Sequence, residues 1–183
     1  PGGIAELAFS PDGRRLATTG PHQAATLWDI RSGRELLDLP IDGRTGLGEH
    51  AAGPDSRVAF SPDGARLALV GFGGVMIWDA TVGPEVLTMH APREVSGLAY
   101  SPDASLGTSS SGRVVLWDAT TGRLESRLDG HASFVFNLAF RPDGRRLASA
   151  SHDKSAKLWD AATGRAIWTL GAHGDLVNAV AFS

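Results

Sequence analysis

Two sequence marks that recur in a fixed order constrain the fold of this chain more than any other feature. The first mark reads apolar-Ala-aromatic-Ser/Arg-Pro-Asp and occurs at 7–12, 58–63, 98–103 and 138–143, with a shortened copy at 180–183. The second mark, Trp-Asp, occurs at 28–29, 78–79, 117–118 and 159–160, and a Gly follows each Asp four positions later. Such self-similarity predicts a repeat protein with a period of about 41 residues.

Each repeat predicts four short strands joined by tight turns. In the fourth repeat the first strand is expected over 135–140, and a Pro-Asp-Gly turn follows at 142–144. The third repeat has Ala104 where the turn needs Gly, so we expect that turn to be strained or differently shaped. No segment has a long 3.6-residue periodicity, and we therefore expect an all-β chain with almost no helix.

Composition excludes several classes of protein. Lys and Arg number 17 against 20 Asp and Glu, and this balance argues against a protein that mainly binds nucleic acid. The chain has no Cys, which excludes a disulfide scaffold, a thiolate zinc site and a cysteine nucleophile. No apolar run approaches the length needed to cross a membrane, so we expect no membrane partner.

The repeat resembles the WD40-repeat β-propeller family, in its bacterial-type form. The resemblance rests on Gly130-His131, the aromatic-Ser-Pro-Asp-Gly turns, Leu147-Ala148-Ser149, Leu158-Trp159-Asp160 and Thr163-Gly164. It implies four-stranded blades around a central channel. The implied blades cover about 4–38, 55–89, 95–129 and 135–170, with the inner strand of a fifth blade at 176–182 and a loop insertion at about 40–53. We expect the chain to be part of a larger propeller of about seven blades.

The resemblance also implies a buried tetrad of His, Ser or Thr, Asp and Trp in each blade. Only the fourth blade carries all four residues, as His131, Ser149, Asp153 and Trp159. The other blades have His22, Phe72 and Ser111 where Asp is expected. We therefore expect blade four to be the most rigid and blade two the most weakly specified.

Catalysis and metal binding find little support in the sequence. His131, Ser149 and Asp153 could be read as a scattered Ser-His-Asp triad, but their spacing is that of the repeat itself. The six His residues show no metal-ligand spacing, and neither a phosphate-binding loop nor a dinucleotide fingerprint is present. We expect no enzyme activity, no metal and no cofactor.

Candidate interaction residues lie at positions that line the top face of a propeller in this family. The two aromatic residues Phe134 and Phe136 occupy positions at which the fold does not require a large apolar side chain. The other candidates are His152, Glu94, Leu176 and Asn178. An exposed aromatic cluster with a polar rim is typical of an interaction site. The alternative is that Phe136 plugs the channel and Phe134 packs against the adjoining blade, and the sequence leaves both open.

The leading functional hypothesis is a non-catalytic scaffold that binds a protein or peptide through the top face, as a module of a larger bacterial, cytoplasmic protein. One alternative is a Tol-type periplasmic propeller repeat. Another is a propeller-based hydrolase or lyase whose active-site residues lie outside this segment. Self-association that completes the propeller is a further expectation, because the inner strand at 176–182 would have an unpaired edge.

Overall fold

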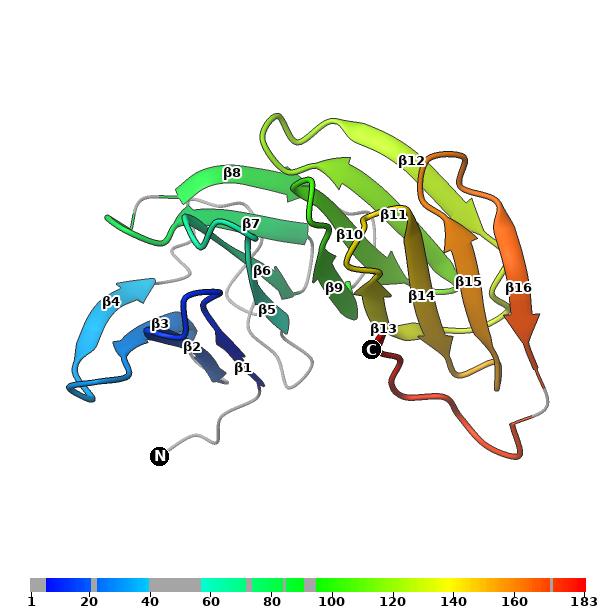
Figure 1. Ribbon diagram of the computed structural model, residues 1–183, viewed down its shortest axis with the longest axis horizontal. Coiled ribbons are helices and arrows are strands. Elements are labelled where there is room, and N and C mark those ends of the chain that lie inside the picture. The colour runs from blue at the N-terminus through cyan, green and yellow to red at the C-terminus, as the bar shows by residue number, and fades with distance from the viewer. Residues whose placement is uncertain are drawn as a thin grey trace. The chain divides into compact units, whose positions relative to one another are not determined.

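Strands and the turns that join them make up most of the described part of the chain. The computed structural model describes residues 6–20, 23–39, 57–71, 74–83, 85–90, 95–171 and 173–183. Within these ranges there is no helix, and sixteen strands form four sheets of four (Figure 1). The all-β expectation is confirmed. The chain divides between Val95 and Ser96 into two compact units.

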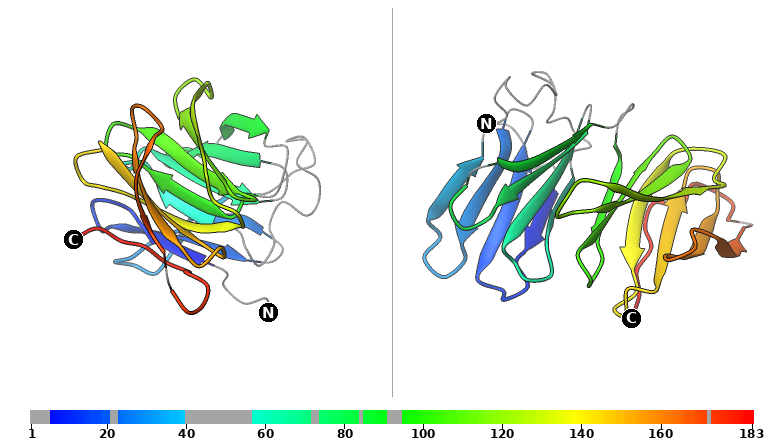
Figure 2. Two further views of the ribbon diagram at one scale, coloured as in Figure 1. Left: turned by 90° about the vertical axis from the view of Figure 1, so that its right-hand side faces the viewer. Right: turned by 90° about the horizontal axis from the view of Figure 1, so that it is seen from above.

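Each sheet is an antiparallel meander in which strands consecutive in sequence pair with one another, and we call the sheets blades one to four. The first unit contains blade one, with β1 (Glu6–Phe9), β2 (Arg15–Gly20), β3 (Gln23–Asp29) and β4 (Glu35–Leu39), and blade two, with β5 (Arg57–Phe60), β6 (Arg66–Gly71), β7 (Gly74–Asp79) and β8 (Glu85–His90). The second unit contains blade three, with β9 (Gly97–Tyr100), β10 (Ser105–Ser110), β11 (Arg113–Asp118) and β12 (Leu124–Asp129), and blade four, with β13 (Val135–Phe140), β14 (Arg146–Ser151), β15 (Ala156–Asp160) and β16 (Ala166–Leu170). No strand passes from one sheet into another (Figure 2).

The Pro-Asp turns between the first two strands of each blade share one backbone conformation. Gly13, Gly64 and Gly144 have φ of 68°, 70° and 71°. Ala104 has the same φ of 68° in blade three. That turn therefore keeps the shape of the others and carries the strain of a side chain in the left-handed region.

Apolar side chains fill the space between the two blades of each unit. In the first unit Leu27 and Leu39 of blade one share a core with Leu67 and Trp78 of blade two. In the second unit the corresponding core includes Leu116 and Leu128 of blade three and Leu138, Leu147 and Trp159 of blade four. Burying one such leucine contributes about 1.5–3 kcal/mol, so the join between blades is the main apolar core of each unit.

Side chains of one blade bind the backbone of the next at the innermost strands. Glu6 in β1 accepts a hydrogen bond through Oε2 from the Val58 backbone N–H in β5, at 2.7 Å. In the second unit Ser96 and Ser109 both donate to the Val135 carbonyl, at 2.8 Å and 2.7 Å. A Cβ on Gly97 would lie 2.3 Å from Ser109 Oγ, so a larger residue there would move this hydroxyl from its place at the Val135 carbonyl.

Two expectations concern the chain outside the four blades. Residues 173–183 belong to no strand, and the inner strand of a fifth blade expected at 176–182 stays a prediction. In this segment the Val177 N–H binds the Ser151 carbonyl and the Val180 N–H binds Asn137 Oδ1. The insertion expected at 40–53 lies outside the described residues.

Candidate functional site

The four side chains that the resemblance assigns to blade four lie in one hydrogen-bonded chain. The Trp159 indole donates to Ser149 Oγ at 2.8 Å. Ser149 Oγ lies 2.7 Å from His131 Nε2, and His131 Nδ1 lies 2.8 Å from Asp153 Oδ2. A neutral imidazole satisfies every contact, because Nδ1–H donates to the carboxylate and Nε2 accepts from the hydroxyl.

Asp153 anchors this chain of contacts to the turn between β14 and β15. Its Oδ2 also accepts from the Ala132 backbone N–H at 2.9 Å. Its Oδ1 accepts from Ser155 Oγ at 2.6 Å and from the Ser155 N–H at 3.0 Å. One carboxylate therefore ties the segment before β13 to the turn that precedes β15.

The protonation states of the pair follow from burial and hydrogen bonding. Burial by itself raises the pKa of Asp153, but the hydrogen bonds from Ser155, the Ala132 N–H and His131 outweigh it and hold that pKa well below its ordinary 3.8. Burial lowers the pKa of His131 below its ordinary 6.5, although the Asp153 carboxylate opposes the change. At neutral pH the pair is a carboxylate beside a neutral imidazole.

The blade tryptophans differ in whether their indole N–H finds an acceptor. Trp28 donates to Thr18 Oγ1 at 2.9 Å, and Trp117 donates to Thr108 Oγ1 at 2.8 Å. Trp78 Nε1 in blade two is buried and has no hydrogen-bond acceptor among the described residues. In the part of the chain that the structure describes, blade two therefore lacks the indole hydrogen bond that the other three blades form, and its weaker specification stays a prediction.

The geometry of blade four gives no basis for nucleophilic catalysis. Ser149 is fully buried, and its Oγ is held between the Trp159 indole and His131. A working nucleophile has to reach its substrate. Across the described ranges, no three His, Cys, Asp or Glu side chains gather in a way that could hold a metal ion. No described helix has the length and apolar character needed to cross a membrane.

Three of the predicted interaction residues form a cluster of rings where β13 begins and β14 ends, and we call them the aromatic shelf: Phe134, Phe136 and His152. The Phe136 and His152 rings are stacked, with centroids 3.7 Å apart and planes inclined by 24°. The Phe134 and Phe136 centroids are 6.5 Å apart. The Phe134 side chain is 46% exposed, whereas Phe136 and His152 are half-buried.

Backbone contacts hold the aromatic shelf in place. The Phe134 carbonyl accepts from Ser151 Oγ at 2.8 Å and from the His152 N–H at 2.9 Å. The end of β14 is thereby fixed to the residue before β13. Ser151 is fully buried, and its supporting role has no signal in the sequence pattern beyond its place at the end of a predicted strand.

The remaining predicted residues have different positions. Leu176 is 43% exposed, and Asn178 is exposed as well. The hydrogen bond from the Val177 N–H to the Ser151 carbonyl places this segment beside the support of the aromatic shelf. Glu94 lies outside the described residues.

A comparison with protein families agrees with the four-stranded repeats. Residues 83–118 and 122–160 match the family described as WD domain, G-beta repeat. The chain belongs to the WD40-repeat family. The matched segments run from the end of blade two to the Trp-Asp mark of blade four, which includes the complete tetrad.

Curated WD40-repeat relatives cover most of this chain. The rice (Oryza sativa) chromatin assembly factor 1 subunit FAS2 homolog is 30% identical over 84% of the chain and 32% of its own length. WD repeat-containing protein SL1-17 of Schistosoma mansoni is 34% identical over 85% of the chain and 50% of its own length. The mouse (Mus musculus) target of rapamycin complex subunit LST8 is 29% identical over 84% and 48%.

The WD40-repeat chain therefore spans between about a third and a half of these relatives. All three come from eukaryotes, so they lend no support to the bacterial-type expectation.

Proposed function

We propose that this WD40-repeat chain is a non-catalytic protein-interaction module and that the aromatic shelf is the surface on which a partner polypeptide docks. The observation that carries the proposal is the exposure of the Phe134 ring, whose centroid lies 6.5 Å from that of Phe136 in the stacked pair of Phe136 and His152. Aromatic side chains dominate the binding energy of many protein interfaces.

The shelf also has the rigidity that favours tight binding. The stacked rings restrict the rotamers of Phe136 and His152, and two hydrogen bonds to its carbonyl fix the backbone of Phe134. A surface that is already ordered loses little conformational entropy on association. These contacts support docking on the shelf without a prior rearrangement of blade four.

The relatives support a protein partner. One is named as a subunit of the target of rapamycin complex and another as a subunit of chromatin assembly factor 1. Both names describe proteins that work in assemblies. The formal charge of −3 of this chain supports a polypeptide partner over a nucleic acid, which needs a basic surface.

A binding comparison among three versions of the full chain tests this function. The versions are the unchanged chain, Phe134→Ala and Trp168→Ala, the last being a matched control because Trp168 is an exposed aromatic residue on β16, outside the shelf. Circular dichroism first establishes that all three fold alike. Proteins captured from a lysate are then quantified, and those lost only with Phe134→Ala are purified and titrated.

We expect Phe134→Ala to weaken binding of a purified partner about tenfold or more, which corresponds to about 1.4 kcal/mol. Trp168→Ala should leave the affinity unchanged. The proposal is overturned if both variants bind as the unchanged chain does, or if both lose the same partners.

A further inference from the structure

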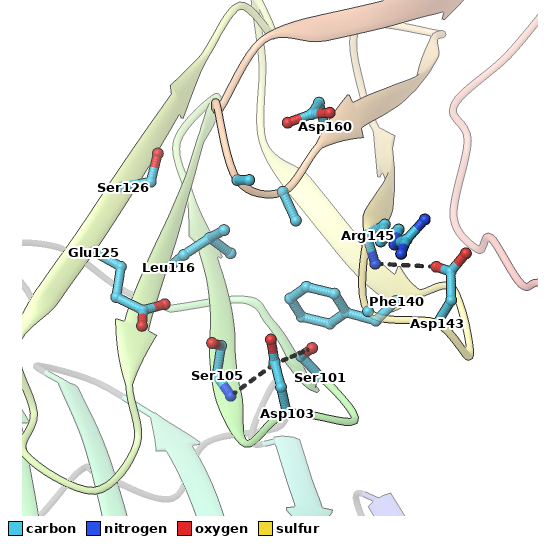
Figure 3. A pocket seen from close by; sticks show the side chains of 13 residues that line it. Ser101, Asp103, Ser105, Leu116, Glu125, Ser126, Phe140, Asp143, Arg145 and Asp160 are labelled. Atoms are coloured by element: carbon cyan, nitrogen blue, oxygen red, sulfur yellow. Dashed lines mark hydrogen bonds between the residues drawn. The ribbon is translucent and has the colours of Figure 1, made fainter.

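A groove lies between blades three and four, at the end of β13 opposite the aromatic shelf. Its volume is about 610 Å³. Its lining includes the apolar side chains of Leu116 and Phe140, together with four acidic residues and one arginine (Figure 3). The charged lining residues are Asp103, Glu125, Asp143, Asp160 and Arg145.

The equivalent join in the first unit is filled by an arginine of the chain itself. Arg15 in β2 donates through Nη1 to the Ala80 carbonyl at 2.8 Å and through Nη2 to the Gly64 carbonyl at 2.7 Å. Its guanidinium carbon lies 5.5 Å from the centroid of the Phe60 ring. Two backbone carbonyls and an aromatic face of blade two therefore form a guanidinium site, which blade one occupies.

Blade four presents the same three features to the groove. Phe140 ends β13 as Phe60 ends β5. The turn glycine Gly144 corresponds to Gly64, and Ala161 follows a Trp-Asp mark as Ala80 does. Phe140, Gly144 and Ala161 all line the groove.

Blade three lacks the arginine that would fill the site. Arg15 pairs with Asp29 across β2 and β3, and the residue in the same register of blade three is Ser105, which pairs with Asp118. Ser105 lines the groove. A hydroxymethyl side chain cannot reach the two carbonyls that a guanidinium reaches from this position, so the site stays open to an outside group.

A second position at which blade three has a shorter side chain than blade one widens the groove. Leu37 pairs with Leu27 in blade one and packs against the core of the first unit. The residue in that register of blade three is Ser126, which pairs with Leu116 and lines the groove. Two large side chains of blade one are thus serines in blade three, and this pair of changes accounts for the space.

We propose that the groove binds an arginine side chain that a partner polypeptide presents. The guanidinium donates to the Gly144 and Ala161 carbonyls and lies over the Phe140 ring, as Arg15 does on blade two. The surrounding carboxylates favour a cation, and the planar fork of arginine matches two separate acceptors better than the compact ammonium of lysine. This site goes beyond the docking of a partner on the aromatic shelf, since it takes a different chemical group at the other end of β13.

An NMR titration of the full chain tests the proposal, with N-acetylarginine amide as the probe. N-acetylcitrulline amide is the matched control, because it has nearly the same shape and no charge. We expect saturable amide shifts confined to residues 101–105, 125–126, 143–145 and 160–162 with the arginine probe, and loss of these shifts with the citrulline probe. Equal shifts with both probes, or no shift with arginine, would overturn the proposal.

Two variants separate guanidinium recognition from general attraction of a cation. Ser105→Arg restores the arginine of blade one, so its own guanidinium should fill the groove and abolish the shifts caused by the probe. Ser126→Leu restores the other large side chain and should weaken the shifts even if Ser105→Arg does not fold. Undiminished shifts in a folded Ser105→Arg chain, or in Ser126→Leu, would show that the probe binds elsewhere.

Discussion

Leu69 occupies the position beside Trp78 at which the other three blades present a hydroxyl to the tryptophan. In blade four that position is Ser149, two residues after Leu147, the residue paired with Trp159. In blade two Leu67 pairs with Trp78, and Leu69 follows two residues later. A leucine offers no acceptor, so the indole N–H of Trp78 is buried without one in the described chain. An unsatisfied buried donor costs about 1–3 kcal/mol.

Replacing Trp159 and Trp78 in turn by phenylalanine should reveal the different contributions of their indole N–H groups to stability. Trp159→Phe removes a hydrogen bond and leaves Ser149 without its donor, whereas Trp78→Phe removes a polar group that had no acceptor. Both side chains are buried, so the loss of apolar contact is similar. We expect Trp159→Phe to lower the free energy of unfolding by about 1–3 kcal/mol more than Trp78→Phe does. Urea unfolding measures both values, and equal losses would contradict the assigned hydrogen bonds.

Asp153→Ala should destabilise the chain more than the loss of an ordinary turn carboxylate. The substitution leaves His131 Nδ1 and the Ala132 N–H without their acceptor. We expect a loss of about 2–3 kcal/mol in the free energy of unfolding. Asp143→Ala is the control, because Asp143 is exposed and accepts one backbone hydrogen bond, from Arg145. Similar losses in the two variants would show that the tetrad does not stabilise blade four.

Stability should fall as the pH drops below about 6.5. The pKa of His131 is lowered in the folded chain, so the unfolded chain takes up a proton first and the free energy of unfolding decreases with decreasing pH. A further loss is expected below the ordinary 3.8 of an aspartate, since the pKa of Asp153 is also lowered. His131→Gln should flatten the part of the profile just below pH 6.5.

His173→Gln is the control for that profile, because His173 is exposed. Chemical unfolding at a series of pH values measures the three curves. A profile that is the same with and without His131 would contradict a buried neutral imidazole.

Ala104→Gly should stabilise blade three. The alanine has a φ of 68°, and a side chain in this left-handed conformation costs about 1–2 kcal/mol, part of which the greater freedom of glycine in the unfolded chain offsets. We expect a gain of about 0.5–1 kcal/mol and a correspondingly higher melting temperature. A melting temperature that falls would mean that this turn relaxes to another shape in solution.

The two phenylalanines of the aromatic shelf should respond differently to truncation. Phe134 is exposed, so Phe134→Ala should change the free energy of unfolding by no more than about 0.5 kcal/mol. Phe136 is half-buried and stacks on His152, so Phe136→Ala should cost about 1–2 kcal/mol. Thermal unfolding distinguishes them, and a large loss with Phe134→Ala would identify that ring as part of the core.

The two repeat marks were enough to predict most of the fold. The aromatic of the first mark ends the first strand of every blade, as Phe60 and Phe140 show, and the Trp-Asp mark ends the third. Both marks are local and periodic, which is why sequence alone could place four sheets of four strands. The partners of Trp159 came from a family resemblance, because residues 22 positions apart, such as His131 and Asp153, have no local pattern that joins them.

The sequence did not predict the features that appear only when the blades are compared with one another. The groove results from Ser105 and Ser126, and two serines on predicted strands give no signal until the strand register sets them against Arg15 and Leu37. The inner strand expected at 176–182 stays a prediction. Its apolar pattern matches an inner strand, but a pattern does not supply the neighbour with which a strand must pair.

The joins at the innermost strands bear on how such a chain diverges in evolution. Glu6 binds the main-chain amide of Val58, and Ser96 binds the main-chain carbonyl of Val135. Any residue except proline at position 58 has a backbone amide that can donate, and any residue at position 135 has a backbone carbonyl that can accept. The receiving blade can therefore change its side chains there without losing the contact. A duplicated blade whose side chains have changed at these positions would still form the hydrogen bond to the preceding blade. Blades can therefore be duplicated and diverge without matched substitutions in their neighbours.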